Sequence, residues 1–320
     1  MERRETTELV CSLGDPNGIG PEVLLKALDQ FDAELGAERV TIVGPEPYLQ
    51  KLSDCLGLPF PPKNVRIRDC GEYPFPPPWG AVTAAAGDLA ATSLIEAVRL
   101  ARSSQAAALV TPPVCKEAMH LAGHRYPGQT EFVGSFFPES RPKMAFFSDP
   151  LRVILVTTHL PLRSVPDVLS VGAVVEATRD LRNALFRLRE EEPVIGVCGL
   201  NPHASENGLF GSEEATVLIP AVEEARNCGW QVEGPLPADT AFLRAYQGRF
   251  DGLVALYHDQ ALIPVKLLAF DRAVNVTLGL PILRTSPDHG TAFDIAGQGT
   301  ADPSSMLEAL RWAVRLGPSR

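Results

Sequence analysis

The distribution of apolar residues along the chain predicts alternating strands and helices. Eight short segments are rich in valine, isoleucine and leucine: Leu9–Leu13, Val40–Val43, Val65–Ile67, Ala106–Val110, Val153–Val156, Val194–Val197, Leu253–Leu256 and Val274–Leu278. Continuous rather than alternating hydrophobicity is typical of strands that are buried on both faces. Between them, Val171–Arg189 carries apolar residues along one face of a helix. This order predicts an α/β architecture with a mostly parallel sheet or sheets.

The length of the chain, 320 residues, is enough for about two domains. The middle of the chain has its own alternation of strands and helices, and loops rich in glycine and proline flank it. We therefore expect one α/β domain made of residues 1–130 with 274–320, and a second α/β domain at residues 131–273. The active site is expected in the cleft between the two domains.

Charge and composition narrow the classes of partner. With 29 basic and 39 acidic side chains, the net charge of −10 is opposite in sign to what a nucleic acid or an anionic membrane attracts. No apolar run approaches the ~20 residues that cross a bilayer, and the first residues lack the apolar stretch of a secretion signal. We expect a cytoplasmic protein that binds neither nucleic acid nor membranes.

The six cysteines form no C-x-x-C pair, and Cys11 and Cys198 lie in apolar runs typical of core thiols.

Three histidines follow apolar segments in the same way. His159, His203 and His258 each come at or just after the end of a predicted strand. In open α/β sheets, ligand crevices form at the carboxyl ends of parallel strands, where three imidazoles can converge on one divalent metal ion. For each histidine alone, a hydrogen-bonded residue at a strand end is the simpler explanation. The three together favour a metal site.

Two other features resemble binding motifs but lack the required context. His120 and His124 have the spacing of two ligands on one helical face, yet Gly123 and the polar, glycine- and proline-containing residues around it argue against a helix through both. We interpret both as surface residues.

The loop Gly14–Glu22 follows a strand and opens a helix, but its glycine spacing matches neither a dinucleotide fingerprint nor a Walker A motif. A tight turn with a helix start explains this loop at least as well as a binding loop does.

Polar side chains are concentrated between His258 and Thr291. Lys266, Asn275 and Arg284 offer an ammonium, an amide and a guanidinium fork, which together suit a small anionic substrate that carries phosphate or carboxylate. We interpret this cluster as a substrate site rather than a solvated surface. The chain has no G-x-S-x-G elbow and no Cys–His neighbourhood that supports acyl-enzyme chemistry.

Seven short blocks of glycine, proline and polar residues run in order over nearly the whole chain: Gly14–Glu22, Thr157–Pro161, Gly199–Ala204, Gly234–Thr240, Tyr257–Gln260, Asn275–Pro281 and Arg284–Thr291. In these blocks the sequence resembles the 4-hydroxythreonine-4-phosphate dehydrogenase family of pyridoxal phosphate synthesis. In addition, His289–Gly297 is similar to the NAD loop of isopropylmalate and isocitrate dehydrogenases. That similarity implies their two-domain α/β/α fold, which binds a dinucleotide without a Rossmann fingerprint.

The resemblance implies metal-dependent oxidation of 4-phosphooxy-L-threonine by NAD or NADP, followed by decarboxylation to 3-amino-2-oxopropyl phosphate. It implies one divalent ion per subunit (zinc, magnesium or cobalt) and a homodimer with a shared active site, with the cofactor on the first domain and the metal on the second. The implied metal ligands are His159, His203 and His258. The implied substrate contacts are Gln129, Thr130, Lys266, Asn275 and Arg284, and the implied cofactor contacts are His289, Gly290, Thr291 and Asp294. For proton transfer we expect Lys266, assisted by Asp239 or Asp259.

Two positions depart from the usual pattern of the family. Gln129 stands where Gly-His-Thr-Glu has histidine, and Pro112 stands where Thr-Gly-Pro has glycine. A neutral amide can donate and accept a hydrogen bond but never carries charge. One alternative is therefore a paralogue that oxidises 4-phosphoerythronate or 4-phosphothreonate, which lack the amine. A more distant alternative is a metal-binding protein on the same fold that is not a dehydrogenase.

Overall fold

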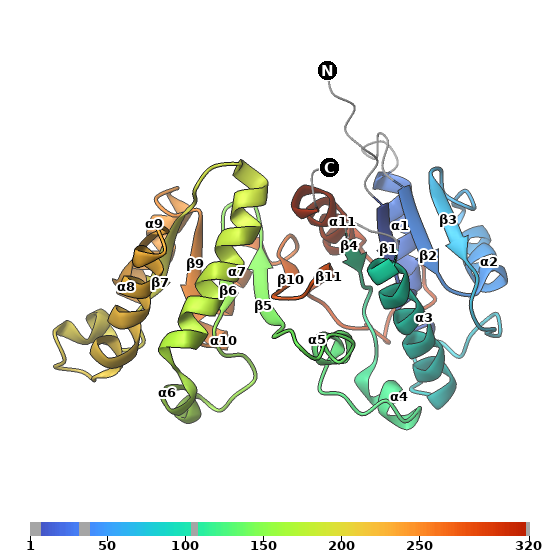
Figure 1. Ribbon diagram of the computed structural model, residues 1–320. Coiled ribbons are helices and arrows are strands. Elements are labelled where there is room, and N and C mark those ends of the chain that lie inside the picture. Colours follow the sequence, from blue (N-terminus) through green and yellow to red (C-terminus); the bar gives the residue numbers. More distant parts are fainter. Residues whose placement is uncertain (1–7, 32–38, 104–107, 318–320) are drawn as a thin grey trace, which may run out of the picture. The chain divides into compact units, whose positions relative to one another are not determined.

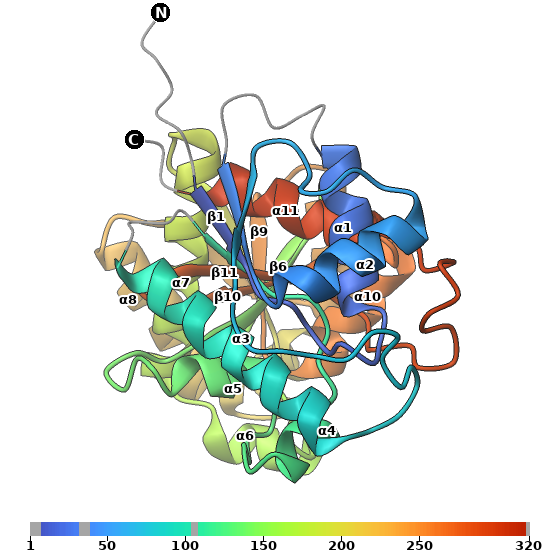
Figure 2. The ribbon, with the colours of Figure 1, turned by 90° about the vertical axis from the view of Figure 1, so that its right-hand side faces the viewer.

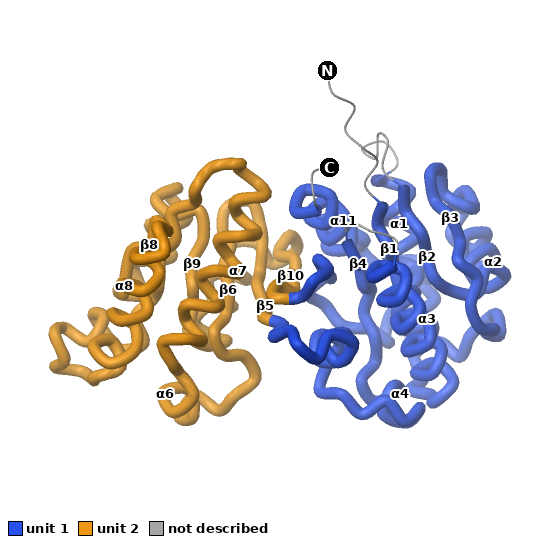
Figure 3. Tube along the Cα trace, in the orientation of Figure 1, with its two compact units in different colours: residues 1–142, 280–320 blue, residues 143–279 orange. Residues whose placement is uncertain are grey.

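The computed structural model describes residues 8–31, 39–103 and 108–317. The chain divides into two compact units, unit 1 (residues 1–142 and 280–320) and unit 2 (residues 143–279), which Figure 3 distinguishes by colour. The sequence-based division into domains at residues 130 and 273, with a cleft between them, stays a prediction.

The five strands described in unit 1 are all parallel to their neighbours. Their spatial order is β3 (Val65–Arg68), β2 (Arg39–Val43), β1 (Glu8–Cys11), β4 (Ala108–Val110) and β11 (Leu283–Pro287). Because parallel neighbours need a crossover connection, helices separate most of these strands along the chain. The strands in the middle of this order are almost entirely buried, as their continuous apolar runs predict.

Helices pack on both sides of the unit 1 strands (Figure 2). The helices described in unit 1 are α1 (Gly20–Phe31), α2 (Glu46–Leu56), α3 (Ala84–Ser103), α4 (Lys116–Leu121), α5 (Gln129–Gly134) and α11 (Ser304–Leu316). Helix α11 contacts β4, β11 and α1, whereas α3 contacts β1, β2 and β4. Helix α3 also packs closely on α4, and a Cβ atom at Gly87 would lie 2.0 Å from the carbonyl oxygen of Ala118. Only glycine permits this approach.

Unit 2 combines parallel and antiparallel pairs. Its strand order is β10 (Val274–Leu278), β5 (Lys143–Phe147), β6 (Arg152–Leu155), β9 (Gly252–Ala255), β7 (Val194–Cys198) and β8 (Gln231–Leu236). Strand β5 is antiparallel to both β10 and β6, and the pairs from β6 to β8 are parallel.

The helices of unit 2 are α6 (Val165–Val168), α7 (Val171–Arg189), α8 (Ile219–Asn227), α9 (Ala238–Tyr246) and α10 (His258–Ala269). A short 3₁₀ turn, Leu162–Ser164, leads into α6, and a π-helical turn, Glu214–Leu218, leads into α8. The segment Pro202–Glu206 after β7 has left-handed backbone from His203 onwards. Helix α7 contacts β6, β9 and β10 and packs on α8, whereas α10 contacts β6 and β9 and α9 contacts β7 and β9 (Figure 1).

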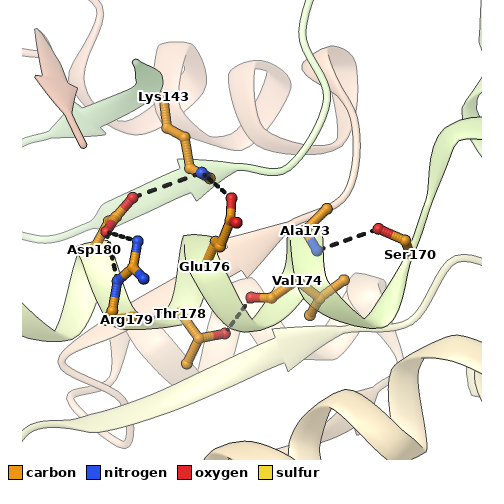
Figure 4. Close-up of polar contacts among 8 residues, drawn as sticks. All are labelled: Lys143, Ser170, Ala173, Val174, Glu176, Thr178, Arg179 and Asp180. Carbon is orange, nitrogen blue, oxygen red and sulfur yellow. Dashed lines mark hydrogen bonds and ion pairs between the residues drawn. The ribbon is translucent and has the colours of Figure 1, made fainter. Parts of the chain in front are cut away.

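Helix α7 shows how local sequence sets an element and joins it to the sheet (Figure 4). It begins after Ser170, whose hydroxyl caps the helix by accepting a hydrogen bond from the backbone N–H of Ala173 at 3.2 Å. Lys143, the first residue of β5, pairs with Glu176 at 3.1 Å and with Asp180 at 3.6 Å. The Lys143 side chain is only 11% exposed, so these ion pairs are largely shielded from water. They hold the start of β5 against α7.

The structure confirms the predicted α/β class, the mostly parallel pairing and the helix at Val171–Arg189. Each of the eight predicted strands has a counterpart, although residues 106 and 107 lie outside the described residues. Strands β5, β8 and β11 were not predicted, because their lysine, arginine, glycine and proline residues interrupt the apolar pattern.

The structure also tests the expectations for the histidine pair, the cysteines and membrane-spanning helices. Helix α4 ends at Leu121, so His120 and His124 do not share a helix. All six cysteines are free, and Cys11 and Cys198 are buried in the core. Among the described residues, the helices are all too short or too polar to cross a membrane.

Candidate functional site

The three histidines expected as metal ligands follow neighbouring strands of unit 2. His159 comes after β6, His258 opens α10 after β9, and His203 lies in the segment after β7. These strands lie side by side in the order β6, β9, β7 and are parallel. Their carboxyl ends therefore meet at one edge of the sheet, which is the place where α/β proteins bind ligands.

Two of these histidines lie close together. The ring centroids of His159 and His258 are 5.7 Å apart, and Nδ1 of His258 is 2.7 Å from Oδ1 of Asp259. An imidazole that donates from Nδ1 to a carboxylate keeps Nε2 available as a metal ligand. The His203 ring instead lies 6.3 Å from that of Phe210. Within the described part of the chain, no group of three or more His, Cys, Asp and Glu side chains is placed to hold a metal ion.

Hydrogen bonds tie the histidine-bearing loops to one another. Thr157 donates from its backbone N–H and from its hydroxyl to the carbonyl of Leu256, at 3.1 and 2.7 Å. Gln260 accepts from the N–H of Leu256 at 2.7 Å and donates to the carbonyl of Gly199 at 2.8 Å. The strand ends that precede His159, His203 and His258 are therefore held together even though the His203 ring is not gathered with the other two.

A buried carboxylate, Glu214, anchors the loop that precedes His203. It is 1% exposed and accepts hydrogen bonds from the N–H groups of Leu200 and Asn201 and from the Asn201 amide, at 2.7–2.8 Å. The next residues, 203–207, all have φ between 46° and 66°, although none of them is glycine. Such left-handed backbone is costly and clusters at functional sites. A role for Glu214 was not predicted from the sequence, because a Glu-Glu pair is usually solvated.

The residues expected to transfer protons are exposed. Asp239 lies in the first turn of α9, after β8, and its Oδ1 accepts from the N–H of Thr240 at 3.0 Å. Lys266 lies in the last turn of α10, and Asp259 in its first turn. Since Asp259 contacts His258, its carboxylate is placed to orient that ring.

Arg284 of β11 is the centre of a second polar group, in unit 1. It is only 3% exposed, and three of its nitrogens donate to neutral oxygens: Nε to Thr111 at 3.0 Å, Nη1 to Thr130 at 3.2 Å and Nη2 to Gln129 at 3.1 Å. Burial lowers the pKa of Arg284 to about 10, against the opposing effect of the Glu131 carboxylate. The guanidinium therefore stays charged at neutral pH.

The structure thus brings three of the expected substrate residues together, namely Gln129, Thr130 and Arg284. The other two, Lys266 and Asn275, belong to unit 2. Oδ1 of Asn275 is buried and has no hydrogen-bond partner among the described residues. That atom is a polar group that a ligand can satisfy.

The expected cofactor residues lie in the loop that follows β11. Nδ1 of His289 is 3.0 Å from the carbonyl of Gly290, while its Nε2 is buried without a hydrogen-bond partner in the described part of the chain. The carbonyl of Thr291 accepts from the N–H of Ile19 at 3.0 Å, and a Cβ at Gly18 would lie 2.8 Å from that carbonyl oxygen. Asp294 is exposed. The first loop of the chain therefore packs directly on the loop that contains Thr291.

The first loop itself is held by its own side chains. Asp15 is fully buried, and burial raises the pKa of its carboxyl group. Its Oδ1 accepts from the N–H of Asn17, and the Asn17 amide donates to the carbonyl of Ala81 and the hydroxyl of Thr83. A buried carboxyl group in place of a lysine does not suit a phosphate cradle, which favours the turn-and-helix-start interpretation.

Comparisons with known proteins agree with the resemblance that the motifs carry. The model of the family described as pyridoxal phosphate biosynthetic protein PdxA matches residues 24–313. A D-threonate 4-phosphate dehydrogenase from Salmonella typhimurium is 42% identical, with 98% of this chain and 99% of the relative covered. A 4-hydroxythreonine-4-phosphate dehydrogenase from Methylorubrum extorquens is 44% identical, with 96% and 94% covered.

Solved structures show the same relationship. The crystal structure of a 4-hydroxythreonine-4-phosphate dehydrogenase from Burkholderia phymatum aligns with a TM-score of 0.87 and 40% identity over 98% of this chain and 99% of that one. A β-decarboxylating dehydrogenase from Thermococcus kodakarensis aligns with a TM-score of 0.53 at 13% identity, over 96% and 82% of the two chains, and this likeness bears on the fold alone. The expected fold class is confirmed. The chain is an oxidoreductase that belongs to the family of the pyridoxal phosphate biosynthetic protein PdxA.

Proposed function

We propose that this chain oxidises 4-phosphooxy-L-threonine with NAD or NADP and a divalent metal ion, and that the product loses CO₂ to give 3-amino-2-oxopropyl phosphate. The observation that carries the proposal is the position of His159, His203 and His258 after three adjacent parallel strands, in a chain of this family. The reaction would serve pyridoxal phosphate synthesis in the cytoplasm.

The donor set suits a divalent ion. His159 and His258 would supply imidazole nitrogens from one edge of the sheet, with Asp259 fixing the orientation of His258. His203 would be the third ligand, on a loop that Glu214 and Gln260 anchor, once its ring turned from Phe210 towards the other two. When bound, zinc, magnesium or cobalt would lower the pKa of the substrate hydroxyl and polarise the ketone that oxidation produces.

The remaining residues would bind the substrate and move protons. Arg284, which donates hydrogen bonds to Gln129 and Thr130, would bind an anionic group of the substrate, and Asn275 offers an unsatisfied oxygen to a donor such as an amine. Lys266, assisted by Asp239 or Asp259, would accept the hydroxyl proton as hydride passes to the nicotinamide. His289, Gly290, Thr291 and Asp294 would hold that cofactor, and the unpartnered Nε2 of His289 fits a ligand there.

A second candidate is the oxidation of a phosphorylated acid without the amine, such as 4-phosphothreonate or 4-phosphoerythronate. Two observations favour it: Gln129 replaces the histidine of the family pattern, and relatives named D-threonate 4-phosphate dehydrogenase are 41–43% identical. Relatives named 4-hydroxythreonine-4-phosphate dehydrogenase are 42–44% identical, so identity alone does not separate the two.

A homodimer formed through unit 2 is part of the proposal. Of the 14 large apolar side chains exposed among the described residues, 13 belong to unit 2, and only Leu121 lies in unit 1. Helix α10 and the residue after it expose Ile263, Leu267, Leu268 and Phe270. Exposed apolar side chains grouped on one helix are typical of surfaces that bind another protein, so α10 would lie in the dimer interface.

The proposal predicts that oxidation depends on a bound metal ion. Dialysis against a chelator should abolish the reduction of NAD or NADP by 4-phosphooxy-L-threonine, and added zinc, cobalt or magnesium should restore it, because histidine ligands release their ion to a stronger competitor. Absorbance of the reduced nicotinamide gives the rate, and release of CO₂ reports the second step. Full activity after the metal content has fallen to background would refute the metal-dependent mechanism.

A further inference from the structure

The amide of Gln129 joins three segments of unit 1. Gln129 is the first residue of α5; its Oε1 accepts from Nη2 of Arg284 at 3.1 Å, and its Nε2 donates to the carbonyl of Pro112 at 3.0 Å. Arg284 comes from β11, and Pro112 follows β4. The two positions at which this chain departs from the family pattern, Gln129 and Pro112, are therefore hydrogen-bonded to each other.

The contacts of Arg284 fix its guanidinium plane. Thr111, Thr130 and Gln129 each accept from a different nitrogen, so the group cannot rotate without breaking a hydrogen bond. Pro112 is stiffened by its ring and packs beside the first loop, since a Cβ at Gly14 would lie 2.9 Å from the Cβ of Pro112. Gln129 thus links Arg284 to a rigid support.

An amide and an imidazole differ in how they can link Arg284 to the carbonyl of Pro112. Glutamine accepts and donates at once at every pH, whereas histidine does so only when it is neutral, and only one of its tautomers turns the accepting nitrogen towards Arg284. A protonated imidazole has no acceptor for Arg284 and adds a second positive charge beside it. Charged groups near this position include Glu131 on α5 and Lys116 on α4, and the Thr111–Pro112 segment carries no charged side chain.

We propose that Gln129 is a positioning residue that holds Arg284 in a fixed orientation for the anionic group of the substrate, and that it does so independently of pH. The proposal rests on the proposed function, because it takes Arg284 as the group that binds the phosphate or carboxylate. Gln129 then acts through Arg284 and not by direct contact with the substrate.

The test compares wild-type enzyme with Gln129→His between about pH 8 and about pH 5.5, a range that spans the ordinary pKa of histidine. At the upper end a neutral imidazole can replace the amide, so KM for the phosphorylated substrate should stay within about threefold of wild type. At the lower end the ratio of the two KM values should rise by about tenfold, with kcat little changed, since a hydrogen bond from a charged donor is lost. Taking the ratio cancels the titration of the substrate phosphate.

Two controls separate the possible outcomes. Gln247→His, at an exposed position of unit 2, should show a flat KM ratio. Gln129→Leu, which neither donates nor accepts, should raise KM by about tenfold at every pH. A flat ratio for Gln129→His, a change in kcat instead of KM, or a KM that falls with acid as for a histidine that contacts the substrate directly, would overturn the proposal.

Thermal unfolding keeps this test separate from that of the proposed function. Because Arg284 disfavours protonation of a neighbouring imidazole in the folded state, Gln129→His should lose stability relative to wild type as the pH falls below about 6.5. A difference in Tm that does not change with pH would refute the contact itself. If the wild-type enzyme oxidises none of the phosphorylated acids, the proposed function fails, whereas the Tm comparison still decides whether Gln129 holds Arg284.

Discussion

Replacing His159 or His258 with alanine is expected to abolish turnover and to weaken metal retention by more than about a hundredfold, since even the loss of an outer partner of a metal ligand costs 10- to 100-fold. The two rings lie 5.7 Å apart at the carboxyl ends of β6 and β9, so each variant removes one donor from the same place. His203→Ala should have the same effect. Metal content after dialysis and kcat measure the two losses.

The fold should survive these substitutions, because His159 and His203 are exposed and the side chain of His258 is 40% exposed. His120→Ala is the matched control: that ring is exposed on α4 and contacts the carbonyl of Tyr126. It should keep full metal content, full activity and the wild-type Tm. If two of the three histidine variants retain metal as the wild type does, the proposed ligand set is wrong.

Arg284→Lys is expected to impair both substrate binding and stability. The guanidinium donates from three nitrogens to Thr111, Thr130 and Gln129, whereas an ammonium has one nitrogen and cannot reach all three in the same plane. KM for the phosphorylated substrate should rise by roughly 10- to 100-fold, and the free energy of unfolding should fall by about 2–4 kcal/mol. Steady-state kinetics and denaturant unfolding measure the two effects.

The matched control is Arg99→Lys on α3, whose side chain is 71% exposed and makes a surface ion pair with Glu96. That change should alter the free energy of unfolding by well under about 1 kcal/mol and leave KM unchanged. An Arg284→Lys enzyme with normal KM would remove Arg284 from the substrate site. A loss of stability without a change in KM would leave it a purely structural residue.

The sequence predicted the edge of the sheet better than the site that forms there. Continuous apolar runs located β6, β7 and β9, and their parallel pairing then placed the three histidines at one edge. The apolar run of β7 could not predict that the following residues 203–207 adopt left-handed backbone, because none of them is glycine. It also could not predict that the His203 ring lies beside Phe210 and not with His159 and His258.

Buried polar residues account for most of the strands and contacts that could not be predicted from the sequence. Strand β11 is fully buried, yet its Leu-Arg-Thr-Ser-Pro sequence resembles a loop, because Arg284 and Thr285 are satisfied by partners far away in the chain. Gln129 and Arg284 are 155 positions apart, so no local pattern relates them. Glu214 was missed for the same reason, since only the fold reveals the three donors that stabilise a buried carboxylate.

The most direct test of the central claim is kcat/KM of the metal-loaded enzyme for 4-phosphooxy-L-threonine, measured with NAD and with NADP beside 4-phosphothreonate and 4-phosphoerythronate. Comparing kcat/KM values measures discrimination in the transition state and not merely affinity. Our account predicts the highest value for 4-phosphooxy-L-threonine, with one CO₂ released for each nicotinamide reduced. A higher value for an acid without the amine, or no reduction with any of the three, would contradict it.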